Sequence, residues 1–210
     1  MTPMKLILRL ILGAALLAGL VSCASTSVRK PYHSNAYRPT NPQNVVVKIS
    51  IENQALYVVE GDKALLVTAA SIGKPTSPTP LGNHRILGKE KYRRRRSNPG
   101  AGYPMGFWCS FHSPAYGIHA GWVHPVPRSA GCVRLHQNVA PKFFELVRVG
   151  TPVIVRNRFP EDQTIGRNLD RPQDYNDPEY PPHILNTDAI FHLYKGRIFE
   201  PGPAPRIPQA

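Results

Sequence analysis

The chain has 210 residues, of which 41% are hydrophobic, with 23 Pro, 16 Gly and a formal net charge of +13. This length suits one domain of ordinary size with irregular ends, and the frequency of Pro and Gly argues against a helical bundle. A charge this positive suits a nucleic acid, an anionic membrane surface or another anionic polymer as partner, and the N-terminal sequence decides among them.

The first 22 residues have the pattern of a bacterial lipoprotein signal peptide. Two basic residues precede an apolar run at 10–21, which is too short to span a bilayer as a helix. The run ends at Val21-Ser22-Cys23, which resembles a lipobox, in which the cysteine becomes the lipidated first residue of the mature protein. The resemblance implies a periplasmic, lipid-anchored protein of the cell envelope, and Ala24 implies the outer membrane. Peptidoglycan and anionic envelope polymers then replace nucleic acid as expected partners.

The elements that follow the signal peptide are mainly short strands. Residues 23–43 are polar and lack an apolar period, which predicts a flexible linker. β-Branched, partly alternating residues begin at Asn44 and predict an antiparallel meander. Residues 73–82 are too rich in Pro and Gly for a regular element. The expected strands are 45–51, 55–59, 64–69, 84–88, 107–111 and 115–119.

One helix and a final strand complete the domain. Asn138 is expected to cap the helix, Pro141 suits its first turn, and apolar residues recur on one face. Residues 151–155 read as the final strand. The C-terminal part is polar and Pro-rich, and only 188–199 is expected to be ordered within it. The predicted organisation is a signal peptide at 1–22, a linker at 23–43, a domain at 44–157 and a C-terminal extension at 158–210.

The residues that carry chemistry are concentrated in GIHAGWVHPVPRSAGCVRL, residues 117–135. Cys132 is a candidate nucleophile, because a nearby His lowers the pKa of a thiol by forming a thiolate–imidazolium pair. Gly131 would let a substrate approach the backbone, and the N–H groups of Gly131 and Cys132 would form an oxyanion hole. The guanidinium fork of Arg134 suits a carboxylate, or else pins the loop.

Other interpretations of the cysteines and histidines stay open. Cys132 is alternatively a buried structural thiol or forms a disulfide with Cys109, as cysteine pairs outside the cytoplasm often do. A metal site would use His119, His124, Cys132 and His136. These spacings match no usual zinc pattern, so we expect no metal and no cofactor. Alternation places Cys109 on one face with two phenylalanines, which favours a free, buried and non-catalytic thiol.

Two further features have both a functional and a structural interpretation. Trp108 and Trp122 either line a cleft or belong to the core. Residues 89–96, KEKYRRRR, form either a solvated loop, which is slightly favoured, or a site that attracts anionic envelope material.

Taken together, the segments of the domain resemble the YkuD-type L,D-transpeptidase catalytic domain. The matching pieces, in the order of that family, are residues 55–58, 71–75, 79–82, 117–119, 129–135 and 149–153. The resemblance implies a mainly β sandwich with one principal helix after the catalytic loop. It also implies that Cys132 is the acyl-accepting nucleophile and His119 its base, with Ser129, Gly131 and Arg134 beside the substrate.

The activity implied by the resemblance is acyl transfer on peptidoglycan stem peptides. An acyl-enzyme would form at the carbonyl of the third residue and pass to an amine, or to water in an L,D-endopeptidase or carboxypeptidase. A non-catalytic lipoprotein that binds the wall is the alternative from another class. Ala130 stands where the family often has His, which removes any proton or hydrogen-bond role for that side chain.

Overall fold

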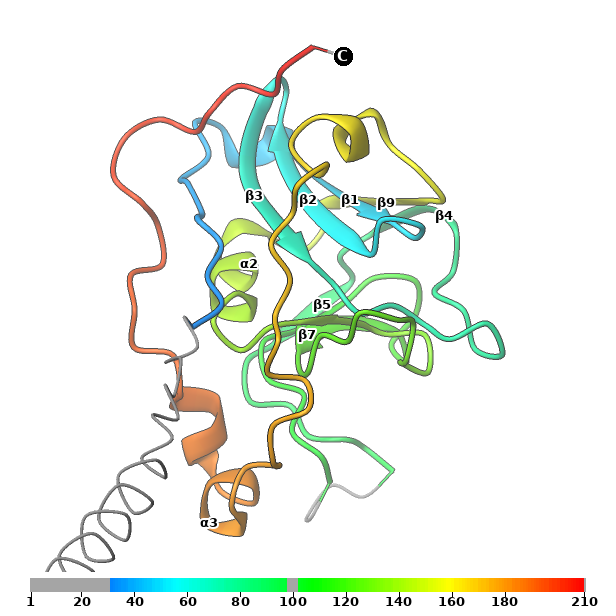
Figure 1. Cartoon of the computed structure of the whole chain (residues 1–210), viewed down its shortest axis with the longest axis vertical. Helices are drawn as coiled ribbons and strands as arrows, with labels where there is room; N and C mark the ends of the chain where they lie inside the picture. Colours follow the sequence, from blue (N-terminus) through cyan, green and yellow to red (C-terminus); the bar gives the residue numbers. More distant parts are fainter. Residues whose placement is uncertain (1–30, 98–101, 210) are drawn as a thin grey trace, which may run out of the picture. The chain divides into compact units, whose positions relative to one another are not determined.

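The computed structural model describes residues 31–97 and 102–209, and from Tyr32 onward they belong to one compact unit. The expected signal peptide and Cys23 lie outside the described residues. Within the described ranges, no helix has the length and apolar character needed to cross a membrane. The unit is mainly β, with two sheets and few helices (Figure 1).

The larger sheet contains the predicted meander. Its strand order is β3-β2-β1-β9-β4. The strands are β1 (Val45–Ser50), β2 (Ala55–Glu60), β3 (Lys63–Ala69), β4 (Gly82–Arg85) and β9 (Pro152–Arg156). β1, β2 and β3 pair antiparallel as expected, whereas β9 pairs parallel with β1 and places Val47 beside Val153. The final strand therefore returns to the middle of the sheet.

The smaller sheet carries the segment singled out for chemistry. Its order is β5-β6-β7-β8, with strands β5 (Gly88–Glu90), β6 (Trp108–Ser110), β7 (Gly117–Ala120) and β8 (Val133–Leu135). The single strand expected at 84–88 is wrong, because the chain changes sheets there. The Ile86 N–H donates to Thr151, which precedes β9, and the Leu87 N–H donates to Ser110 of β6.

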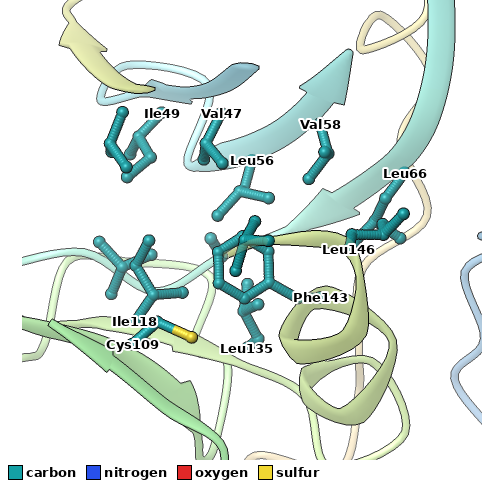
Figure 2. Close-up of a cluster of buried hydrophobic side chains, with 14 of the residues drawn as sticks. Val47, Ile49, Leu56, Val58, Leu66, Cys109, Ile118, Leu135, Phe143 and Leu146 are labelled. Atoms are coloured by element: carbon teal, nitrogen blue, oxygen red, sulfur yellow. The ribbon is translucent and has the colours of Figure 1, made fainter. Parts of the chain in front are cut away.

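The core lies between the two sheets and α2 (Ala140–Leu146) packs against it (Figure 2). Phe143 and Leu146 of α2 meet side chains of both sheets there. Pro141 occupies the first turn, as predicted, but the predicted cap is wrong. The helix starts after Val139 without a side-chain cap, and the amide of Asn138 instead donates to the Tyr32 carbonyl at 3.1 Å.

The segments on either side of the domain pack on it more than their composition suggests. In the expected linker, Ala36 is fully buried and forms a β-bridge with Leu66 of β3, and η2 spans Pro42–Asn44. The C-terminal extension contains η3 (Pro160–Gln163), α3 (Pro182–Leu185) and η4 (Asp188–His192), with Ile190 and Phe191 buried. Isolated apolar residues anchor these segments, and so few of them leave no period in the sequence.

Candidate active site

Two paired strands hold the candidate nucleophile and base. β7 carries His119, and β8 begins directly after Cys132; the strands pair in parallel, with His119 opposite Arg134. The side chains of Cys132 and His119 both line one cavity of about 640 Å³. Because the backbone ladder fixes the register of the two strands, the sheet determines how these side chains stand relative to each other.

The Cys132 thiol is partly buried and bonded to the backbone. Its sulfur donates weakly to the Ala115 carbonyl at 3.8 Å, and the Gly117 N–H donates to the sulfur. Burial raises the pKa of Cys132 above its usual range, although the Gly117 N–H and the charges of Arg134 and Arg93 lower it. The thiol is therefore protonated at neutral pH.

The imidazole of His119 is buried and held in one tautomer. Nδ1 lies 2.7 Å from the Ala120 carbonyl, and since a carbonyl only accepts, Nδ1 carries the proton and Nε2 keeps its lone pair. Burial lowers the pKa of His119 to about 4, and the charges of Arg134 and Arg93 act in the same direction. His119 is thus a neutral imidazole at neutral pH.

These two environments do not support the expected thiolate–imidazolium pair in the resting site. Burial disfavours both charged forms, and within the part of the chain described here no hydrogen bond joins Cys132 to His119. A neutral base beside a neutral thiol transfers the proton only as the sulfur attacks. Arg134 and Arg93 would then stabilise the thiolate as it forms.

Ser129 and Gly131 shape the turn before the nucleophile. The buried Ser129 hydroxyl donates to the Cys132 carbonyl and accepts the Gly131 N–H at 3.0 Å. Gly131 has φ +105°, and a Cβ there would lie 2.5 Å from the Tyr116 ring. The space expected to admit a substrate is therefore filled by Tyr116, and the Gly131 N–H expected in an oxyanion hole is already bonded.

Thr79, in the matching piece at residues 79–82, connects that piece to this turn. Its buried hydroxyl accepts the Gly73 N–H at 2.9 Å and donates to the Gly131 carbonyl at 3.0 Å. The hydroxyl thus ties the irregular segment at 73–82 to the residue before Cys132. The sequence pattern indicated the segment but not this hydrogen-bonding role.

The aromatic side chains and Arg134 form the walls of the cavity. Trp108 stacks on His119 with ring centroids 5.6 Å apart, and Trp122 stacks on Tyr180 at 5.5 Å. Both tryptophans line the cavity, although Trp108 is also buried. Arg134 lines it too and forms no ion pair with any residue that the structure describes.

The basic segment at residues 89–96 was slightly favoured as a solvated loop. The structure corrects this interpretation, because part of the segment belongs to the cavity. Arg93, Arg95 and Arg96 line the same cavity as Cys132. Arg93 is buried, with its guanidinium carbon 4.0 Å from the Trp108 ring centroid. The pairing of β5 with β6, which sets Glu90 opposite Trp108, brings the segment to the cavity. The run of arginines was visible in the sequence, but this contact was not.

Cys109, His124 and His136, the other candidates that the structure describes, have partners of their own. Cys109 is free and fully buried, as expected, and burial raises its pKa to about 12. His136 pairs with Asp174 at 2.7 Å, and the ring of His124 contacts Tyr175. Across residues 31–97 and 102–209, no group of three or more His, Cys, Asp or Glu side chains could hold a metal ion.

Comparisons with known proteins agree with this arrangement. Residues 44–155 match the family model YkuD, the L,D-transpeptidase catalytic domain. L,D-transpeptidase 1 of Mycobacterium tuberculosis is 29% identical over 124 residues, or 50% of this chain and 48% of the relative. A Bacillus licheniformis relative named after L,D-transpeptidase YkuD is 30% identical over 122 residues, or 55% of this chain and 68% of the relative. A crystal structure of an L,D-transpeptidase from Stackebrandtia nassauensis is 24% identical, covers 60% of each chain and has a TM-score of 0.49.

The extent of these matches differs. The chain spans about half the length of the M. tuberculosis relative, but the family match covers more than half of this chain. The family match includes β7 with His119, the loop that leads to Cys132, and β8 directly after Cys132. The chain therefore belongs to the YkuD family of L,D-transpeptidase catalytic domains.

Proposed function

We propose that the protein is an L,D-transpeptidase that acts on peptidoglycan stem peptides through an acyl-enzyme on Cys132. The observation that carries the proposal is that His119 of β7 and Cys132, which directly precedes the neighbouring strand β8, line one cavity. Family membership supplies the reaction class. The thiol is itself the nucleophile, so the scheme requires neither a metal nor a cofactor.

The proposed reaction has two steps. First, Nε2 of His119 accepts the thiol proton while the sulfur attacks the carbonyl of the third residue of a stem peptide. The bond to the fourth residue breaks, its amine takes the proton, and a thioester on Cys132 remains. Second, an acceptor amine attacks the thioester, gives up a proton through His119 and restores the thiol. The acyl chain thereby cross-links the wall or anchors another molecule to it.

The developing oxyanion needs a hydrogen-bond donor close to the sulfur. Because Ser129 already accepts the Gly131 N–H, the Cys132 N–H is the remaining candidate of the two. Ser129 then acts as a positioning residue that sets the direction of the Cys132 peptide. Loss of one good donor of this kind typically costs about 3–4 kcal/mol of barrier.

The test of the proposal is the mass of the protein and of the products after incubation with a disaccharide tetrapeptide. We expect a thioester adduct on Cys132 and a released fourth residue. Cys132→Ala should abolish both. Cys109→Ser is the matched control, because this thiol is buried in the core: it should retain activity within several-fold and lose about 1–2 kcal/mol of stability. Full activity in Cys132→Ala would refute the mechanism.

The products separate the related functions. Cross-linked dimers support a transpeptidase, whereas tripeptides formed with an acceptor amine present would support an L,D-carboxypeptidase instead. Binding to isolated walls without any covalent adduct would favour a wall-binding lipoprotein. The intact Cys–His pair favours turnover, because binding alone needs no nucleophile.

For location, we propose that Cys23 carries a lipid and that the protein works in the periplasm, anchored to the outer membrane. The signal-like sequence before Cys23 supports this proposal. Mass spectrometry of the native N-terminus should find a diacylglyceryl-modified Cys23. A mature protein that begins elsewhere and carries an unmodified Cys23 would contradict it.

A further inference from the structure

The cavity that contains Cys132 and His119 has a strongly basic wall. Arg93, Arg95 and Arg96 reach it from the segment after β5, and Arg134 reaches it from β8. No Asp or Glu among the described residues lines this cavity. We call these four residues the arginine wall.

Few carboxylates neutralise the arginine wall. Glu90 pairs with Arg93 at 3.1 Å and with Arg96 at 3.7 Å, so one carboxylate serves two guanidiniums. Arg95 and Arg134 form no ion pair with residues in the described ranges. At the rim, Glu179 interacts with Tyr103, whose pKa is raised to about 12 by burial first and by this carboxylate second. The cavity therefore keeps an excess of positive charge.

The arginine wall combines one immobilised guanidinium, that of Arg93, with guanidiniums that are exposed. Arg93 is held by the Trp108 ring, by Glu90 and by a 3.4 Å hydrogen bond to the Pro114 carbonyl. The side chain of Arg96 is 71% exposed, and Arg95 is exposed as well. Such side chains can close on a ligand by forked hydrogen bonds to its oxygen atoms.

We propose that the arginine wall is a subsite for free carboxylates of the peptide that acylates Cys132. The inference rests on the proposed function. An anion bound here lies in the same cavity as the nucleophile, so it belongs to the reacting molecule rather than to a distant polymer. Stem peptides whose carboxyl groups are free are then preferred over the same peptides with these groups converted to amides.

The experiment compares two tetrapeptides of one sequence, one with free carboxylates and one amidated. Binding is measured on Cys132→Ala protein by calorimetry at low and high salt, and KM and kcat are measured on the parent protein. We expect the free peptide to bind at least about tenfold tighter, through KM rather than kcat, and to lose this advantage as salt rises.

Variants locate the effect. Arg95→Gln with Arg96→Gln should bring the two peptides within about threefold of each other, since each guanidinium contributes a charged hydrogen bond. The matched control is Arg167→Gln with Arg197→Gln, which removes the same charge from exposed positions outside the cavity and should keep the preference. If a variant does not fold, the comparison of the free and the amidated peptide on protein with the intact arginine wall still tests the carboxylate preference.

The outcomes separate this inference from the proposed function. Equal or tighter binding of the amidated peptide would overturn the subsite, as would a preference that survives the loss of Arg95 and Arg96. A wall that binds poly(glycerol phosphate) but ignores peptide carboxylates would also overturn it. If Cys132 forms no adduct but the carboxylate preference holds, the proposed function fails and the subsite stands. If the protein turns over both peptides without preferring the free carboxylates, the proposed function stands and the subsite fails.

Discussion

At the scale of single residues, a stack of two side chains, Arg93 and Trp108, affects the protonation of His119, the proposed base. Arg93 lies over one face of Trp108, and Trp108 stacks on His119 with an interplanar angle of 26°. The stack limits rotation of the imidazole, excludes water and brings a positive charge near it. All three effects favour the neutral form that can accept a proton.

The resting state of the nucleophile follows from the same surroundings. Iodoacetamide reacts with thiolates, and burial raises the pKa of Cys132 above the usual value of 9.0. Alkylation of Cys132 should therefore be slow at neutral pH and increase only as the pH rises past about 9. Peptide mass mapping distinguishes it from Cys109, whose burial should keep it unreactive. A fast plateau that begins below pH 7 would instead indicate a resting thiolate–imidazolium pair.

The sequence revealed the reacting residues better than their surroundings. Cys132 and His119 stand in a compact motif whose chemistry depends on residue type. Arg93 lies at the site because β5 pairs with β6. No local sequence pattern indicates this pairing. Gly131 was expected beside the substrate, but which atoms fill the space at a glycine depends on a distant ring, that of Tyr116.

At the scale of elements, the C-terminal extension packs against a residue of the cavity wall, Trp122. We call residues 170–182 the strap. Asp174 of the strap bonds His136 at 2.7 Å, Tyr175 contacts His124, and Tyr180 stacks on Trp122 of the cavity wall. The strap contains no regular helix or strand before α3, so these side-chain contacts hold it in place.

Removal of one stacking contact should loosen the strap measurably. An aromatic pair contributes about 0.5–1.5 kcal/mol beyond burial, so Tyr180→Ala should raise the open population roughly 2- to 12-fold. Chymotrypsin cleavage after Tyr175, within the strap, should accelerate by about the same factor. Tyr180→Phe, which keeps the ring, is the control and should resist cleavage like the parent. Unchanged proteolysis in Tyr180→Ala would mean that the stack does not hold the strap.

Element boundaries were harder to predict than element types. The meander and the helix were expected where they occur, since β-branched runs and a 3.6-residue period are local signals. Asn138 failed as a cap because its amide bonds the Tyr32 carbonyl, a contact across 106 positions. The same kind of long-range contact splits the strand expected at 84–88 between two sheets.

At the scale of the whole molecule, the segment that matches the family and the compact unit of the structure end at different residues. The family match ends at residue 155, but the chain beyond it covers the outer side of β2. There Ile165, Leu169 and Ile207 pack on Tyr57, whose hydroxyl donates to Asp162 at 2.7 Å. Burial and this carboxylate raise the pKa of Tyr57 strongly.

A chain that ends at residue 157 should therefore be much less stable than the full domain. Each apolar side chain that loses full burial costs about 1.5–3 kcal/mol, so the three partly buried residues together contribute several kcal/mol. Denaturant unfolding should show a lower midpoint for the truncated chain. Asp162→Asn weakens the polar contacts of this carboxylate, which also accepts hydrogen bonds from Ser50 and the Phe159 N–H, and should cost about 1–3 kcal/mol. Equal midpoints for the full and truncated chains would contradict this account.

The attachment of the reacting pair to a sheet, and of the arginine wall largely to a loop, has an evolutionary consequence. Cys132 and His119 are held by the register of β7 and β8, whereas three of the four wall residues lie between β5 and β6. Insertions or substitutions in that loop can alter which peptide is accepted without disturbing the geometry of bond making. Substrate preference can thus diverge rapidly among descendants of one ancestor while the chemical step stays the same. Grafting residues 91–97 onto a relative would transfer the preference as a module.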